Sequence, residues 1–251
     1  MYRYLLTGTA LATLAVPLAA QTLIEDKRTQ PIRTSQLKGG AGDAVKVTDK
    51  GSIELTAGSA ITVDGDHDTT NAGKIVVTNA DGASGIEVVG DRQADIVNSG
   101  TITIDETYTA EDIDNDKDLD GPFAVGRDRV AIRVRGNLVG DIRHTGTITV
   151  EGNESAGISV AGLLDGDFVH DGKTSVLGDD SVGVEVGDVT GNVRLAGTIS
   201  AAGEGSSAAH LGGDIDGALV VQGTIAATGY RYTTAPTDPS KLDDDDLLQG
   251  G

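Results

Sequence analysis

The sequence predicts an all-β chain folded as a right-handed parallel β-helix, a solenoid of about seven coils of 22–27 residues with three short strands per coil. A phrase of the form Gly-Ile-x-Val recurs at a constant spacing, with first residues Ala131, Gly157 and Gly183. Within each unit, β-branched apolar residues alternate with polar ones, which is the period of a strand and not of a helix. Gly, Asn, Asp and Ser separate these runs and supply the corners, and the crossover rule for parallel strands predicts the hand.

A second phrase, Gly-Thr-Ile, marks the successive coils. The phrase begins at Gly100, Gly146, Gly172, Gly197 and Gly223, and two looser copies begin at Gly51 and Gly73. The step from Gly100 to Gly146 is long, whereas the later steps nearly equal the spacing of the first phrase. The long step is therefore expected to contain one coil and an insertion. Stacking should place Ile158 over Ile132 and Val160 over Val134, at a strand spacing of about 4.8 Å. The predicted core is a set of aliphatic columns.

Composition supports a thin aliphatic core and excludes several classes of function. The chain of 251 residues has 36 glycines, two phenylalanines and no tryptophan, so few side chains are large enough to fill a wide interior. It has no cysteine, which excludes disulfides and thiolate metal sites. Its formal net charge of −20 makes nucleic acid and anionic lipid unfavourable partners, and we expect no nucleic-acid binding.

Residues 1–20 have the pattern of a secretory signal peptide. Arg3 gives a positive start, residues 5–16 form an uncharged apolar run, and residues 17–20 supply a cleavage region before Gln21. The apolar run is too short to span a bilayer. We therefore expect export through the inner membrane, with a buried N-terminal helix as the structural alternative.

The rest of the chain divides into four parts. Residues 21–40 are polar and aperiodic, and they are predicted to cap the open end of the first coil. The solenoid is predicted for residues 41–229, with an inserted acidic loop at residues 105–128. Residues 230–251 contain four consecutive aspartates and are predicted to form a second acidic lateral loop. We expect the chain to be a truncated piece of a longer protein.

Together, the leader, the polar first segment and the repeated phrases, as in residues 98–102, resemble the N-terminal passenger region of autotransporters of Gram-negative alphaproteobacteria, the type V secretion family. The resemblance covers about residues 21–249. It implies a passenger at the cell surface or outer membrane, or outside the cell, and a C-terminal outer-membrane β-barrel of the same polypeptide, which this sequence lacks. It also implies a stalk-like or adhesin-like protein whose ligand, a protein or a glycan, is unknown.

The inserted loop contains a candidate calcium site. Its aspartates alternate along the chain and end at a glycine, as the oxygen ligands of a calcium loop do; they are Asp112, Asp114, Asp116, Asp118 and Asp120. Two features depart from an EF-hand, because Arg127 occupies the position of the bidentate glutamate and no helical pattern flanks the loop. These departures favour the simpler alternative of a solvated acidic loop. No other cofactor is expected.

Two of the four histidines are in register with the repeat. His144 and His170 are separated by one period and are predicted to stack one coil apart, where they could share a metal or titrate as a pair near pH 6. Aligned positions hold Asn98, Leu195 and Val221, which predicts a corner column. Because no third ligand is evident, the pattern does not favour a zinc site.

Enzymatic patterns are weak, and we expect no enzymatic activity. No Gly-x-Ser-x-Gly elbow is present. Aspartates recur after glycine in successive coils and are interpreted as one structural corner column, because catalysis needs a special pair rather than a repeat; they are Asp141, Asp167, Asp188 and Asp214. The alternatives to an interaction protein are a polysaccharide-degrading β-helix enzyme and a component of a surface layer or filament.

Overall fold

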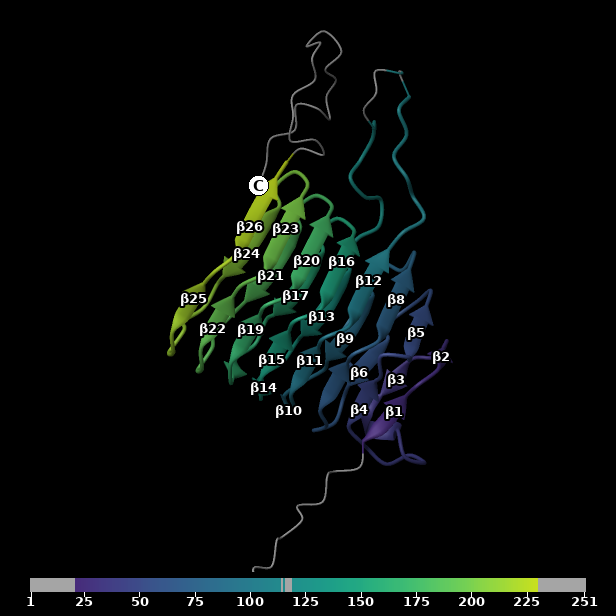
Figure 1. Ribbon diagram of the computed structural model, residues 1–251, viewed down its shortest axis with the longest axis vertical. Helices are drawn as coiled ribbons and strands as arrows, with labels where there is room; N and C mark the ends of the chain where they lie inside the picture. Colours follow the sequence, from purple (N-terminus) through teal and green to yellow (C-terminus); the bar gives the residue numbers. More distant parts are fainter. Residues whose placement is uncertain (1–20, 114, 116–118, 230–251) are drawn as a thin grey trace, which may run out of the picture.

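The chain folds as a parallel β-solenoid of about eight turns in the computed structural model, which describes residues 21–113, 115 and 119–229 (Figure 1). Each full turn contributes one strand to each of three parallel sheets. Sheet A is β1 (Thr22–Ile24), β4 (Val45–Val47), β7 (Thr69–Asn71), β11 (Ile96–Asn98), β15 (Ile142–His144), β19 (Phe168–His170), β22 (Val193–Leu195) and β25 (Leu219–Val221). Sheet B is β2 (Lys27–Arg28), β5 (Ser52–Leu55), β8 (Lys74–Thr78), β12 (Thr101–Asp105), β16 (Thr147–Glu151), β20 (Lys173–Leu177), β23 (Thr198–Ala202) and β26 (Thr224–Thr228). Sheet C is β3 (Ile32–Arg33), β6 (Ile61–Val63), β9 (Ser84–Val88), β13 (Val130–Val134), β17 (Ala156–Val160), β21 (Val182–Val186) and β24 (Ser207–Leu211).

Two smaller elements complete the described residues. A three-stranded sheet lies between sheets C and A in the middle coils and consists of β10 (Arg92–Gln93), β14 (Leu138–Val139) and β18 (Leu164–Asp165). The only helix described is the single 3₁₀ turn η1 (Thr34–Gln36). Within the described residues, no helix has the length and apolar character needed to cross a membrane.

The coil count differs from the prediction by one, because residues predicted to be a cap form a coil themselves. Strand β1 pairs with β4, β2 with β5 and β3 with β6, all in parallel. Arg28 is in register with Ile53, so the first coil places a cation where most later coils carry an isoleucine. Strand pairing uses backbone groups, so a coil can form without the repeated phrase.

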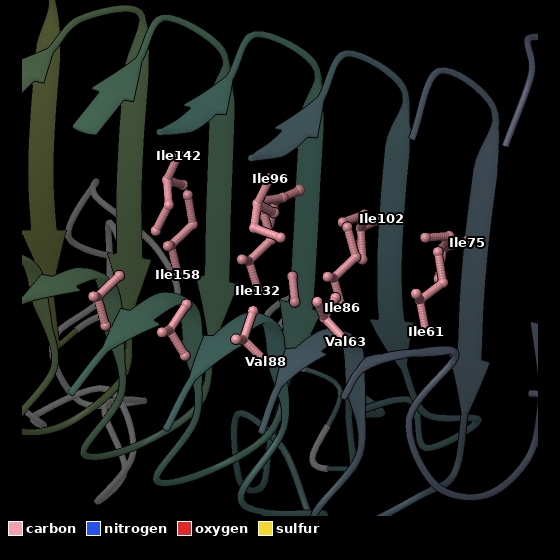
Figure 2. Packing of buried hydrophobic residues seen from close by; sticks show 14 of the residues in the cluster. Ile61, Val63, Ile75, Ile86, Val88, Ile96, Ile102, Ile132, Ile142 and Ile158 are labelled. Carbon is pink, nitrogen blue, oxygen red and sulfur yellow. The ribbon is translucent and has the colours of Figure 1, made fainter. Parts of the chain in front are cut away.

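The predicted register of the core is confirmed. Ile158 pairs with Ile132 and Val160 with Val134, and Ile86 continues the isoleucine column on the other side. Figure 2 shows these isoleucines in a row inside the coils, close to the isoleucines of the other sheets. The four isoleucines of this column from Ile61 to Ile158 are fully buried, and a fifth, Ile32, continues it into the first coil at 1% exposure. Each coil therefore buries one aliphatic side chain at every inward position of this kind, and this burial stabilises the stack.

Close approach between coils, more than backbone conformation, explains the glycine of the Gly-Thr-Ile phrase. A Cβ on Gly146 would lie 2.0 Å from the carbonyl oxygen of Gly100, and one on Gly172 would lie 2.5 Å from that of Gly146. Neither residue has a positive φ, whereas Gly197 has a φ of 74°. At Gly146 and Gly172, a side chain is excluded because the coils stack backbone on backbone.

Candidate functional site

The inserted loop leaves the solenoid after β12 and returns before β13, and Figure 1 shows it rising beyond the ends of the neighbouring coils. Glu106, at the start of the insertion, binds the residues at which the insertion returns. The two carboxylate oxygens accept hydrogen bonds from the backbone N–H groups of Val125 (2.7 Å) and Gly126 (2.8 Å). One of them also accepts a hydrogen bond from the guanidinium of Arg129 at 2.9 Å. A buried carboxylate with three donors fixes where the loop leaves the body.

Arg129 connects this carboxylate to the coils on both sides. Its side chain is 3% exposed, and that of Glu106 is 5% exposed, so the pair is buried. The guanidinium also donates to the carbonyl oxygen of Ala80 in the preceding coil (3.3 Å) and to that of Glu151 in the following coil (2.7 Å). Asp81 supplies a second carboxylate at 3.3 Å. Arg129 therefore holds three consecutive coils together at the root of the insertion.

Only part of the candidate calcium loop is described. Asp114, Asp116 and Asp118 lie outside the described residues. Asp120 forms an antiparallel bridge with Glu111, and its carboxylate accepts a hydrogen bond from the N–H of Ile113. In the described part of the chain, no three His, Asp or Glu side chains are grouped to hold a metal ion. Asp112 and the other aspartates of this loop therefore remain a predicted calcium site.

Arg127 illustrates how the loop returns to the solenoid. One terminal nitrogen of its guanidinium donates to both carboxylate oxygens of Glu154, at 2.6 and 2.7 Å, and both side chains are mostly exposed. Its backbone N–H donates to Asp81 at 2.9 Å. The residue that stands in place of the EF-hand glutamate is thus a cation paired with the next coil.

The histidines are stacked as predicted, but they lie inside the solenoid and not at a corner. His144 and His170 are in register on β15 and β19, both are fully buried, and their ring centroids are 4.9 Å apart in an edge-on arrangement. Asn98 and Asn71 continue the same column toward the N-terminus. The amide of Asn71 donates to the side-chain oxygen of Asn98 at 2.8 Å. Polar side chains therefore occupy the interior where they can bond one another.

Hydrogen bonds account for every ring nitrogen of the pair in the neutral form. The Asn98 amide donates to Nδ1 of His144 (3.0 Å), so Nε2 carries the proton and donates to the carbonyl oxygen of Lys173 (3.3 Å). Nδ1 of His170 donates to the carbonyl oxygen of Ala196 (2.8 Å), and Nε2 accepts from the hydroxyl of Thr174 (2.9 Å). Burial lowers the pKa of His144 to about 4, with His170 adding to the effect, and burial also lowers the pKa of His170. No lone pair is left for a shared metal.

Acidification is expected to destabilise the solenoid through His144. An unfolded histidine titrates near pH 6.5, and the folded His144 near 4, so stability is full above pH 6.5 and falls as the pH drops toward 4. The loss at pH 4 should be roughly 3 kcal/mol. Urea unfolding of residues 21–251 at several pH values measures it. His144→Asn, which extends the asparagine column, should remove this part of the pH dependence, and an unchanged profile would contradict the assignment.

The corner aspartates form two structural columns and not the single column predicted. In the first, the Asp141 carboxylate accepts the N–H of Asp167 (2.9 Å), and the Asp167 carboxylate accepts the N–H of Asn192 (2.7 Å). Asp188 belongs to another corner, where it accepts the N–H of Asp214 at 2.8 Å. The shorter step between Asp167 and Asp188 marks the change of corner, because a full coil from Asp167 ends at Asn192.

The Glu106–Arg129 pair has no counterpart among the sequence predictions. An arginine at the end of an acidic loop looks like an ordinary surface cation in the sequence. One signal was present, because Arg129 stands in register with Ser155 and Ser181, which are buried in the next two coils. A long cation at a buried serine position indicates a buried acidic partner.

Comparison of the chain with protein-family models, with curated proteins and with solved structures returned no match.

Proposed function

We propose that the chain is an exported cell-surface passenger of an autotransporter, a rigid stalk that presents the insertion after β12 to a surface ligand. One observation carries this proposal most directly. The insertion is anchored at its root by the buried Glu106–Arg129 network, while its body rises away from the coils (Figure 1). A loop held at fixed ends on a stacked repeat is a common way to position a binding segment.

Two further features support export and interaction rather than chemistry. The leader pattern at residues 1–20 lies outside the described residues and is a property of the sequence. The corner carboxylates that a polysaccharide-degrading enzyme would need, such as Asp141 and Asp167, accept backbone N–H groups of the next coil. Catalysis would need these carboxylates free to act on a substrate, whereas an adhesin-like role does not. A filament or surface-layer component finds no specific support among the described residues.

Export is tested by expressing residues 1–251 in a Gram-negative host. We expect the chain to reach the periplasm with residues 1–20 removed, so that the mass of the product begins at Gln21. Leu14→Arg places a charge in the apolar run and should leave uncleaved precursor in the cytoplasm. Thr13→Ser is the matched control and should behave as the parent chain does. Uncleaved parent chain in the cytoplasm would refute export.

A further inference from the structure

A shallow groove runs along the outer face of sheet C, beginning beside the returning end of the insertion at Asp128 and lying away from the buried histidines. It has a volume of about 440 Å³ and crosses four consecutive strands, β13, β17, β21 and β24. Neighbouring strands of a sheet lie about 4.8 Å apart, so the groove presents the same positions repeatedly along the solenoid axis. A site of this shape suits an extended ligand with a repeat of its own.

Three parallel rows of side chains form the groove. The floor has a polar row, Arg133, Ser159, Glu185 and His210, which are in register on the four strands. Beside it runs a row of mostly small apolar residues, Val130, Ala156, Val182 and Ser207. The third row, at the corner, contains Asp128, Glu154 and Asp180, with φ values of 54°, 50° and 51°. The groove therefore has a narrow apolar strip between a polar floor and a carboxylate wall, in which Val130 and Ala156 are buried and Val182 is half-buried.

Arg133 is the most constrained charged group of the groove. Its side chain is 9% exposed, and its terminal nitrogen donates to the backbone oxygen and to the carboxylate of Asp128, both at 2.9 Å. Its Nε is buried and has no hydrogen-bond partner among the described residues. A buried donor without a partner is costly, so native structures rarely leave one unexplained. An oxygen acceptor seated on the groove floor, with a small movement of the side chain, would satisfy it.

The polar row also contains acceptors. Ser159 donates its hydroxyl hydrogen to Glu185 at 3.1 Å, and His210 lies 3.6 Å from the other oxygen of the same carboxylate. The side chain of Glu185 is 44% exposed and that of Asp128 is 55% exposed, so both carboxylates can accept further hydrogen bonds. The groove thus offers hydrogen-bond donors and acceptors side by side.

The charge balance selects among ligand classes. The lining carries two arginines, Arg133 and Arg135, against four carboxylates, Asp128, Glu154, Asp180 and Glu185. This excess, on a chain of net charge −20, repels a polyanion. Two of the four carboxylates are already paired with arginines, Asp128 with Arg133 and Glu154 with Arg127, so a polycation would gain little from them. An uncharged ligand rich in hydroxyl groups avoids both problems, because a hydroxyl donates to a carboxylate and accepts from a guanidinium.

We propose that this groove binds a linear, uncharged glycan along the solenoid axis. The apolar C–H face of a sugar ring would lie on the half-buried Val182, and the hydroxyl edges of the glycan would face the polar row and the carboxylate wall. As the ligand class of a surface adhesin, this inference rests on the proposed function. Among the described residues, no Phe, Tyr or Trp lines the groove, so a single site should bind weakly, with a Kd on the order of 1 mM.

The test is a titration of purified residues 21–251, followed by amide chemical shifts in NMR spectra. The probes are cellotetraose and maltotetraose as neutral glycans, tetragalacturonate as an anionic glycan and tetralysine as a cationic peptide. We expect saturable shifts with at least one neutral tetrasaccharide and weaker binding of both charged probes. Failure of both neutral probes at about 10 mM, or tighter binding of a charged one, would overturn the proposal.

Variants locate the binding to the groove. Arg133→Gln should weaken binding of the neutral glycan about tenfold, since it removes the buried donor. Ser159→Leu, an outward substitution on β17, fills the floor of the groove and should weaken glycan binding to a similar degree. If the arginine variant fails to fold, this variant still tests whether the groove is the binding site. Arg143→Gln alters an exposed arginine on sheet A and should bind as the parent chain does. Equal weakening in this control would refute the groove. Binding is measured on purified chain, so its failure is distinct from a failure of export.

Discussion

Replacing Ile148 by aspartate is expected to lower the free energy of unfolding by about 5 kcal/mol or more. Ile148 is fully buried on β16 and stands in register between Ile102 and Thr174. The substitution removes a large aliphatic side chain and places a carboxylate in the column, without a cation beside it. Such a loss is comparable with the whole stability of many domains.

Thr149→Asp is the matched control, one residue further along the same strand. Thr149 points outward, and its partners in register are Thr103 and Ser175, so no carboxylate faces the new one. Its cost should stay within about 1 kcal/mol. Urea unfolding of residues 21–251 followed by circular dichroism compares the two variants. Similar midpoints would refute the inward and outward assignment of β16.

Periodicity predicted the repeated part of the fold well, because burial imposes the same demand on every coil. Inward positions such as Ile132 and Ile158 must be apolar, and the constant step between them follows from the length of a turn. The first coil was missed, since a strand such as β2 is held by backbone hydrogen bonds and tolerates Lys27 and Arg28. The first coil buries Ile24 and Ile32, but these two residues stand alone and do not repeat the phrases that mark the later coils.

Polar residues inside the solenoid explain the other errors. Asn98 and His144 were interpreted as corner residues because the aligned positions hold polar and apolar residues alike, including Leu195 and Val221. In the folded chain the amide of Asn98 hydrogen-bonds the ring of His144, although the two residues are far apart in the sequence. This hydrogen bond forms only because the insertion between them is looped out of the solenoid. The Glu106–Arg129 pair is similar, because its partners meet only once the chain between them returns to the solenoid.

Arg129→Met is expected to lower the free energy of unfolding by about 3–5 kcal/mol, because it leaves the buried carboxylate of Glu106 without its cation. It also removes the hydrogen bonds to the carbonyl oxygens of Ala80 and Glu151. The chain with both Glu106→Gln and Arg129→Met should be less destabilised than the sum of the two single changes. Such a deficit in a double-mutant cycle measures the coupling of the pair.

Arg127→Met provides the matched control, since it also removes an arginine of the returning loop. Its ion pair with Glu154 is exposed, with side chains 61% and 57% accessible, so the cost should be below about 1 kcal/mol. Limited proteolysis adds a local measurement: loss of Arg129 should speed cleavage within residues 106–128 more than loss of Arg127 does. Because the proposed stalk presents this insertion from a fixed base, equal effects of the two substitutions would remove the structural support for that presentation.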